Sequence, residues 1–283
     1  MSEIQYRVAK NVKDACAAMA GAKGKGYILA GGTDLLVQMK SGAREPGTIV
    51  DVKKIPEMMS ITEKNGAFTI GAAAPAAVIG EHKKLKKTWP GVVEAINLIG
   101  STQVQGRASA GGNLCNASPA ADGVPALLAL GAEIELVSRG GKRRLALSDF
   151  ILGPRKIALR PDEIASALLI PKPKGAAHSS FVKLGARKYL VISIVMAAGY
   201  LDVVGSRIVE ARVAVGSCSP VALRLPALEA ALKGEVAISN LARLVKPEHL
   251  APLAPIDDVR ASADYRAEAA LVAVRRLLSE LAV

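Results

Sequence analysis

The first forty residues alternate between helical and strand-like spacing of apolar side chains. Within residues 12–19, apolar side chains stand at positions 12, 16 and 19, the spacing that places them on one face of a helix. A glycine-rich turn then leads into the apolar run 27–30, which we expect to be a buried strand. Gly31-Gly32 follow, and the Thr and Asp that open residues 33–40 suit the electropositive first turn of a helix. The pattern predicts helix, strand, glycine turn and helix, with Cys16 as a small core residue.

The middle of the chain carries shorter apolar segments separated by glycine and proline. Residues 92–99 have the spacing of an amphipathic helix that ends at Gly100. The segment 109–122 packs small residues, amides and hydroxyls and shows no helix or strand periodicity. The other elements expected here are strands at 48–52, 67–71, 133–137 and 168–173, a turn at 139–142, and a short helix at 126–130 behind Asp122 and Pro125.

The last hundred residues contain a clear hairpin signal. Residues 192–204 and 208–215 flank Gly205-Ser206, and the apolar residues at 209, 211, 213 and 215 would share one face of a sheet. Helical spacing is expected at 228–232, 238–245 and 263–281, the last with the stripe Leu271, Val274, Leu278 and Leu281. We place boundaries near 53–56 and at 172–177. The pattern thus predicts a domain at 1–172, with subdomains of about 1–55 and 56–172, and a second domain at 178–283.

Charge and composition limit the kinds of ligand or partner that this chain is expected to bind. Lys and Arg number 37 against 25 Asp and Glu, a net charge of +12 that favours an anionic ligand, an acidic partner surface or a nucleic acid. Aromatic residues make up only 3%, which provides few stacking platforms for single-stranded nucleic acid. The cluster Lys83, Lys84, Lys86 and Lys87 is read as a solvated helix face, with docking of an acidic subunit as the alternative.

Cysteine and histidine spacing argues against a metal or iron–sulfur centre on this chain. Cys16, Cys115 and Cys218 are too far apart for a CxxC motif, and His82, His178 and His249 lack ligand spacing. The N-terminal segment has no features of a signal peptide, and no stretch of about 18 uncharged apolar residues follows. We therefore expect a cytoplasmic protein without a transmembrane segment.

The glycine segments are the strongest chemical signal. A glycine pair between a strand and a helix lets the backbone approach a diphosphate, while the helix N-terminus offers unpaired N–H groups, and residues 30–34 fit that role. A Rossmann turn does not fit, because counting from Gly24 and Gly26 puts Leu29 where the third glycine belongs. A P-loop fails because Tyr27, not Lys, follows Gly26.

Five segments together resemble the FAD-binding subunits of molybdenum hydroxylases, which include the medium subunit of aerobic carbon monoxide dehydrogenase and the flavin domain of xanthine dehydrogenase. They lie at 28–36, 99–104, 110–122, 181–187 and 262–266, in the family's order and over nearly the whole chain. The resemblance implies an α+β fold: a two-subdomain FAD-binding fold of the vanillyl-alcohol-oxidase/PCMH type, followed by a C-terminal domain of antiparallel sheet plus helices.

The resemblance also implies which residues bind FAD, and no catalytic or metal-ligating residue on this chain. Backbone N–H groups and the hydroxyl and amide side chains of two segments would hold the diphosphate. Asp122 would accept hydrogen bonds from the flavin portion, Ile99 would pack near the isoalloxazine or adenine end, and Lys183 would contact the flavin ring and stabilise its reduced, anionic form. The implied set is Ile28, Leu29, Ala30, Gly31, Gly32, Thr33, Asp34, Leu35, Ile99, Ser109, Ala110, Gly111, Gly112, Asn113, Ser118, Asp122 and Lys183.

Two positions depart from the family pattern. Relatives usually carry Arg-Asn where this chain has Gln105-Gly106, and Thr-Ile-Gly-Gly where it has Ser-Ala-Gly-Gly at 109–112. Ser109 keeps the hydroxyl, so diphosphate binding is expected to survive. The missing guanidinium at position 105 is expected to affect affinity for FAD or for the iron–sulfur subunit.

By the resemblance, this chain passes electrons onward and does not oxidise the substrate. A molybdopterin-binding large subunit would oxidise the substrate, a small subunit would relay electrons through [2Fe-2S] clusters, and FAD on this chain would pass them to an external acceptor. A dimer of such heterotrimers is expected. The alternatives are a stand-alone flavin-dependent oxidase of the same fold and a basic nucleic-acid-binding protein, which would show salt-dependent binding to DNA and no flavin.

Overall fold

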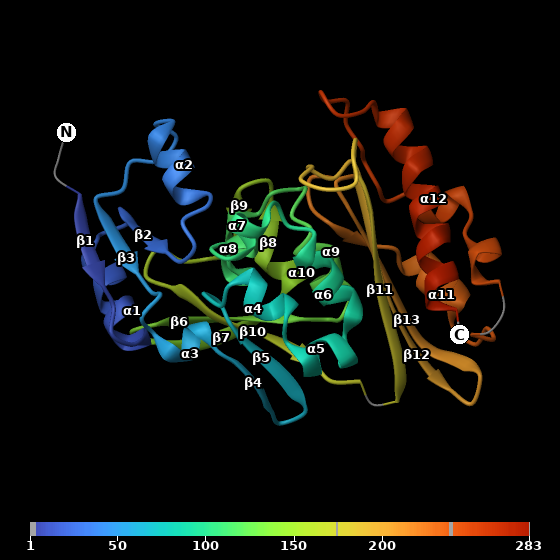
Figure 1. Cartoon of the computed structure of the whole chain (residues 1–283), viewed down its shortest axis with the longest axis horizontal. Coiled ribbons are helices and arrows are strands. Elements are labelled where there is room, and N and C mark those ends of the chain that lie inside the picture. Colours follow the sequence, from blue (N-terminus) through green and yellow to red (C-terminus); the bar gives the residue numbers. More distant parts are fainter. Residues whose placement is uncertain (1–3, 174, 238–239, 283) are drawn as a thin grey trace.

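In a computed structural model, which describes residues 4–173, 175–237 and 240–282, three sheets follow one another along the long axis of the molecule (Figure 1). The N-terminal sheet has the order β1-β3-β2, the middle sheet β4-β5-β10-β6-β7 and the C-terminal sheet β11-β12-β13-β14. A two-stranded ribbon, β8-β9, accompanies the middle sheet. The mixture of parallel and antiparallel sheets with helices confirms the predicted α+β class.

The N-terminal sheet is parallel and consists of β1 (Gln5–Val8), β2 (Gly26–Leu29) and β3 (Thr48–Asp51). Helix α1 (Val12–Gly21) begins where the Asn11 side chain accepts a hydrogen bond from the Asp14 N–H, and it buries Cys16 in the core as predicted. This packing confirms the first predicted helix and strand.

Helix α2 (Leu35–Lys40) differs from its prediction. It begins at Leu35 and not at Thr33, and the side chain of Asp34, at the position before the helix, makes no capping hydrogen bond. None of its residues is buried, and Val37 is 65% exposed. The carboxylate of Asp34 is free to bond elsewhere, and it does so across the cleft described below.

The middle sheet is antiparallel throughout. Its strands are β4 (Ile61–Lys64), β5 (Ala67–Gly71), β6 (Glu133–Ser138), β7 (Gly141–Ala146) and β10 (Ile164–Pro171), and the ribbon is β8 (Ile151–Gly153) and β9 (Lys156–Ile157). Its helices are α3 (Pro56–Met59), α4 (Ala76–Gly80), α5 (Lys83–Thr88), α6 (Pro90–Asn97), α7 (Thr102–Gln105), α8 (Ala110–Asn116), α9 (Gly123–Ala129) and α10 (Leu147–Phe150). The strands and the two helices expected from apolar spacing are confirmed.

Helix α8 corrects the sequence analysis, which found no periodicity between 109 and 122. Glycines have low intrinsic helix propensity, and this helix contains Gly111 and Gly112. Its formation rests on capping and packing instead: the Ser109 hydroxyl accepts the Gly112 N–H, and Ala110 and Leu114 are buried in the main core. Tertiary packing thus overrides a weak local signal.

The C-terminal sheet consists of β11 (Ala176–Leu184), β12 (Val195–Val204), β13 (Arg207–Gly216) and the short β14 (Leu223–Arg224). The β12–β13 hairpin turns at Gly205-Ser206, both with positive φ, as predicted. The outer face of the sheet is covered by α12 (Ala263–Leu281) and α11 (Pro226–Leu232) (Figure 1). Val274, Leu278 and Leu281 of the predicted stripe are fully buried.

Only part of the expected helix at 238–245 can be compared with the structure. Residues 238 and 239 lie outside the described residues, and Leu241–Leu244 form a 3₁₀ turn, η1, followed by a second such turn, η2 (Pro247–Leu250). The helical prediction was therefore wrong for 241–244. The short turn carries Leu241 into the core beneath α12.

The inner face of the C-terminal sheet packs against α6 and α9, so the middle and C-terminal parts share one core (Figure 1). Tyr200 on β12 meets Trp89 edge to face, with 5.6 Å between ring centroids. Phe181 and Met196 extend the same cluster. Shared burial of this kind fixes the C-terminal sheet relative to the glycine segments. No helix in the described ranges has both the length and the apolar character needed to cross a bilayer.

Candidate functional site

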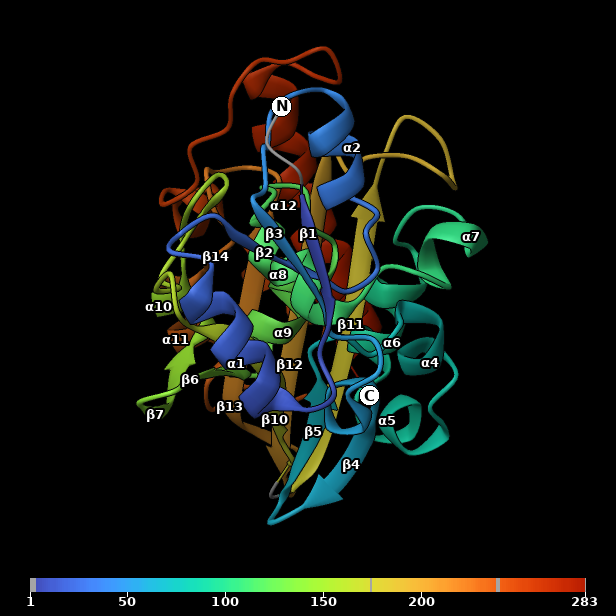
Figure 2. The same ribbon diagram turned by 90° about the vertical axis from the view of Figure 1, so that its left-hand side faces the viewer.

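The fold brings the two glycine segments into direct contact. Gly31, in the turn after β2, lies so close to the chain before α8 that a Cβ there would stand 1.9 Å from the Arg107 carbonyl oxygen. Gly32 has a φ of +77°, in the left-handed region that favours glycine. In Figure 2, which looks onto the N-terminal sheet, α8 lies behind β2 and β3. Only glycine permits this approach, which explains the residue type at both positions.

The turn at Gly31–Thr33 is rich in unpaired hydrogen-bond donors. The backbone N–H groups of Gly31, Gly32 and Thr33 have no acceptor among the residues that the structure describes. They precede α2, whose N-terminus adds a partial positive charge. Three successive N–H donors at one turn form a site for an anionic oxygen.

The second glycine segment does not offer the free backbone N–H groups that were predicted for it. The Gly111 N–H already donates to the Ala72 carbonyl, the Gly112 N–H to Ser109 Oγ, and the Asn113 N–H to the Ser109 carbonyl. These amides are thus occupied within the chain. What remains is the Asn113 side chain, whose Oδ1 is buried and has no partner in the described part of the chain. A buried acceptor without a donor is costly, which suggests a ligand group beside it.

Both segments line one open cleft of about 700 Å³. Most of the candidate residues face it: Ile28, Ala30, Gly31, Gly32, Thr33, Asp34, Leu35, Ile99, Ser109, Gly111, Gly112 and Asn113. Leu29 and Ala110 are buried and lie outside the lining. Ser118 accepts the Ala120 N–H through its Oγ and also lies outside the lining.

A polar network crosses the mouth of the cleft, and the sequence analysis missed it. Asn116 on α8 donates through Nδ2 to Asp34 Oδ1 at 2.7 Å, and its own Oδ1 accepts from Gln38 Nε2 at 3.1 Å and from Arg155 Nη1. Arg155 comes from the turn between β8 and β9. No sequence spacing connects 34, 116 and 155, so only the fold reveals that α2 is tied to α8 across the cleft.

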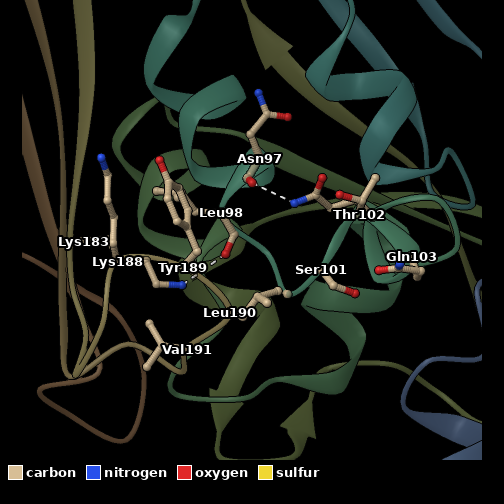
Figure 3. A pocket seen from close by; sticks show the side chains of 12 residues that line it. Asn97, Leu98, Ser101, Thr102, Gln103, Lys183, Lys188, Tyr189, Leu190 and Val191 are labelled. Atoms are coloured by element: carbon tan, nitrogen blue, oxygen red, sulfur yellow. Dashed lines mark hydrogen bonds between the residues drawn. The ribbon is translucent and has the colours of Figure 1, made fainter.

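A smaller pocket of about 380 Å³ adjoins the cleft. The segment 98–105 forms a common wall, since Ile99 and Val104 face the cleft whereas Leu98 and Thr102 face the pocket. In Figure 3 this wall, with Thr102, lies opposite the segment 188–191 that follows β11. The cleft and the pocket therefore lie on the two sides of this wall.

Lys183 and Asp122 are brought together at this pocket. Lys183 lines it, and its Nζ donates to Asp122 Oδ2 at 2.7 Å and to the Leu98 carbonyl at 3.2 Å. The Asp122 carboxylate itself lies behind the lining and accepts the Ser193 hydroxyl through Oδ1 at 2.5 Å. Burial raises the pKa of Asp122, while the ammonium group of Lys183 and the Ser193 hydroxyl oppose that shift.

Gln105, the position that departs from the family pattern, also lines the small pocket. Its Nε2 donates to the Asn97 carbonyl at 2.7 Å, a bond that closes the C-terminal end of α6 against α7. Gly106 ends α7. The amide therefore has a structural partner, and no guanidinium stands at this wall.

The cysteines and histidines contribute no nucleophile or metal ligand set to this region. Cys115 borders the cleft, but burial raises the pKa of its thiol to about 12, so it stays protonated at neutral pH. Cys16 and Cys218 are buried free thiols. Across 4–173, 175–237 and 240–282, no three His, Cys, Asp or Glu residues group closely enough to hold a metal ion. Within the described residues, the free donors of the site suit an anionic group.

Comparison with known families divides the chain into two matches. Residues 2–173 match the family described as "FAD binding domain in molybdopterin dehydrogenase". Residues 180–281 match the "CO dehydrogenase flavoprotein C-terminal domain".

Relatives of this chain include FAD subunits of dehydrogenases. The nicotinate dehydrogenase FAD-subunit of Eubacterium barkeri is 34% identical over 171 residues, which are 59% of this chain and 58% of that subunit. The putative xanthine dehydrogenase FAD-binding subunit of Escherichia coli is 28% identical and covers 89% of this chain and 87% of its own. The carbon monoxide dehydrogenase medium chain of Hydrogenophaga pseudoflava is 26% identical over 97% of this chain and 96% of its own.

Solved structures agree over the full length. A chain of carbon monoxide dehydrogenase from Hydrogenophaga pseudoflava superposes with a TM-score of 0.90 at 27% identity, covering 99% of this chain and 97% of that one. A chain of quinoline 2-oxidoreductase from Pseudomonas putida gives 0.89 at 26% identity, with the same coverage. The fold around both glycine segments is thus shared with oxidoreductases.

Proposed function

The chain belongs to the FAD-binding medium subunits of the molybdenum hydroxylase family, and from this premise we propose that it passes electrons from the [2Fe-2S] clusters of a partner subunit to an external acceptor. It is an oxidoreductase subunit with an FAD-binding domain. When bound, FAD supplies the redox chemistry, and the residues of this chain hold and orient it. Substrate oxidation takes place on another subunit.

The observation that carries this proposal is the unused donor set at the contact of the two glycine segments. The free N–H groups of Gly31, Gly32 and Thr33 would be donors for an FAD diphosphate, and the unpaired Asn113 Oδ1 would be an acceptor for one of its hydroxyl groups. Each hydrogen bond to a charged oxygen contributes about 1.5 to 3 kcal/mol. Several such bonds suffice for tight retention of a dinucleotide. The residues present therefore fit the cofactor that the family implies.

The arrangement of cleft and pocket suggests the orientation of the cofactor. The residues at Gly31–Thr33 in the cleft would hold the diphosphate, and Ile99 and Lys183 would line the space for the flavin ring toward the small pocket. Leu29 and Ala110 support the two turns from the core, and Asp122 acts through Lys183. In this proposal the occupied amides of α8 leave the Ser109 hydroxyl and the Asn113 side chain as the contributions of that segment.

The partners follow from the family. We place the molybdenum cofactor on a large subunit and the [2Fe-2S] clusters on a small subunit, as the likeness to carbon monoxide dehydrogenase implies. A dimer of heterotrimers, a cytoplasmic location, and the domain division at 172–178 remain predictions of the same proposal.

The test is electron delivery in the assembled complex. The complex is purified, its subunits are separated, and flavin, molybdenum and iron are assigned to each. Reduced [2Fe-2S] partner is then mixed with this chain without oxygen, and loss of the visible flavin absorbance is followed. The proposal predicts flavin without metal on this chain and reduction by the partner. A flavin that is reduced only by direct addition of an organic substrate to the lone chain would instead identify a stand-alone oxidase.

A further inference from the structure

A buried serine, Ser193, contacts the ion pair formed by Lys183 and Asp122. Both oxygens of the Asp122 carboxylate are engaged: Oδ2 accepts from Lys183 Nζ at 2.7 Å, and Oδ1 accepts from Ser193 Oγ at 2.5 Å. Ser193 is 1% exposed and lies outside the lining of both the cleft and the pocket. It therefore contacts the carboxylate and not the space where the cofactor would lie.

We propose that Ser193 is a positioning residue: its hydroxyl fixes the Asp122 carboxylate, which in turn holds the ammonium group of Lys183 at the wall of the small pocket. The inference rests on the proposed function, in which this pocket receives the flavin ring. A carboxylate with one oxygen free can rotate about its side-chain bonds, and a lysine has a long flexible stem. With both oxygens engaged, only Oδ2 is presented to Lys183.

The backbone around Ser193 is held firmly enough for this role. Arg266 on α12, itself 2% exposed, donates from Nη1 to the Ile194 carbonyl at 2.7 Å. Its Nη2 forms an ion pair with Asp258 at 2.7 Å. The Ile194 N–H also donates to the Leu184 carbonyl of β11 at 2.8 Å. These bonds hold the backbone of the residue that follows Ser193.

The consequence concerns the reduction potential of the flavin. The Asp122 carboxylate offsets most of the Lys183 charge, so the effect on the flavin would come from the third ammonium N–H, whose donation to the ring favours the reduced, more negative form. The Lys183 ammonium has two acceptors, Asp122 Oδ2 and the Leu98 carbonyl at 3.2 Å. If the carboxylate turns, the ammonium moves with it, and the reduced form loses part of its stabilisation.

The experiment is a redox titration of the FAD-loaded complex with Ser193→Ala, Ser193→Thr and a matched control. Ser180→Ala is that control, because Ser180 Oγ also donates to a carboxylate, Glu280 Oε2 at 2.9 Å, but on the face of the C-terminal sheet that α12 covers. In a fixed redox buffer, Ser193→Ala lowers the ratio of reduced to oxidised flavin on the order of fivefold, as expected for a weakened charged contact. The Thr variant, which keeps a hydroxyl, and the Ser180 control stay within about twofold of the wild type.

Other results overturn the inference. A Ser193→Ala potential equal to that of the wild type does so, as does an equal shift in the Thr variant. Failure of a folded Ser193→Ala to retain FAD also counts against it, because Ser193 has no contact with the cofactor in this scheme. Should the Ala variant not fold, Ser193→Cys, similar in size but a weaker donor, must shift the ratio in the same direction. A wild-type complex without flavin would refute the proposed function itself, a separate outcome.

Discussion

Replacing Gly31 by Ala tests whether the contact between the two glycine segments builds the cofactor site. The added Cβ would stand 1.9 Å from the Arg107 carbonyl oxygen and 2.6 Å from its carbonyl carbon. Both are backbone atoms, so neither can turn aside as a flexible side chain could. One of the two segments must therefore move by more than an ångström, and the N–H groups of Gly31 to Thr33 move with it.

The expected loss of FAD affinity follows from the number of N–H donors that no longer point at the diphosphate. Misdirecting one N–H donor to a charged oxygen costs about 1.5 to 3 kcal/mol of binding, which raises the Kd for FAD roughly 10- to 150-fold. Overpacking of the turn costs a further 1 to 3 kcal/mol, roughly, of folding stability. Gly21→Ala is the control, because a Cβ there meets nothing within 4 Å.

The assay is FAD binding by fluorescence quenching, with thermal unfolding of the same samples. We expect Gly31→Ala to lose affinity while it remains folded, and Gly21→Ala to match the wild type. Wild-type FAD affinity in Gly31→Ala would refute the argument, because the contact would then play no part in forming the site.

Three further predictions concern folding stability and Gln105, the position at which this chain differs from the family pattern. Arg266→Met leaves the Ile194 and Ser217 carbonyls without their shared donor and should cost about 3 to 5 kcal/mol in urea unfolding, whereas a change below 1 kcal/mol, roughly, would contradict it. The hydrogen bonds from Arg143 lower the pKa of Glu163, so this pair stabilises the fold at pH values above the pKa of Glu163 in the unfolded chain, and that stability is lost as the pH falls through its lowered pKa in the folded protein. Arg143→Met should therefore cost about 2 kcal/mol of folding stability at neutral pH and much less in acid. A cost that does not change with pH would refute this role of the pair. Gln105→Arg adds a cation to the small pocket and should tighten FAD binding severalfold at low salt, an effect that is absent if position 105 faces only a partner.

Apolar spacing was sufficient for the elements that bury one face. The α1 helix, the β12–β13 hairpin and the stripe on α12 follow from it, because periodicity reports which side of an element meets the core. It failed at α8, where two glycines and small side chains carry no period and the helix depends on the Ser109 cap and on contacts with Ala72. It also failed at 241–244, where the spacing predicted a helix and the chain forms a single 3₁₀ turn.

In the candidate site, too, some features could be predicted from the sequence and others only from the fold. The residue type alone predicted a special role for Gly31 and Gly32, because glycine is required there by a close backbone approach or a positive φ. The Asn116–Arg155 bond and the Ser193 hydroxyl gave no signal, because their partners lie 39 and 71 residues away in the chain. Whether an amide such as Gly112 N–H is free or already paired is likewise decided by the fold and not by the segment's composition.

The most direct measurement is the identity and amount of flavin held by this chain in its native complex. The complex is purified, the flavin is released by denaturation and identified by chromatography, and its amount is divided by the amount of this chain. The proposed function predicts FAD, at one molecule per chain and absent from the other subunits. A complex that contains its partners but carries no FAD on this chain, even after incubation with excess FAD, would contradict it.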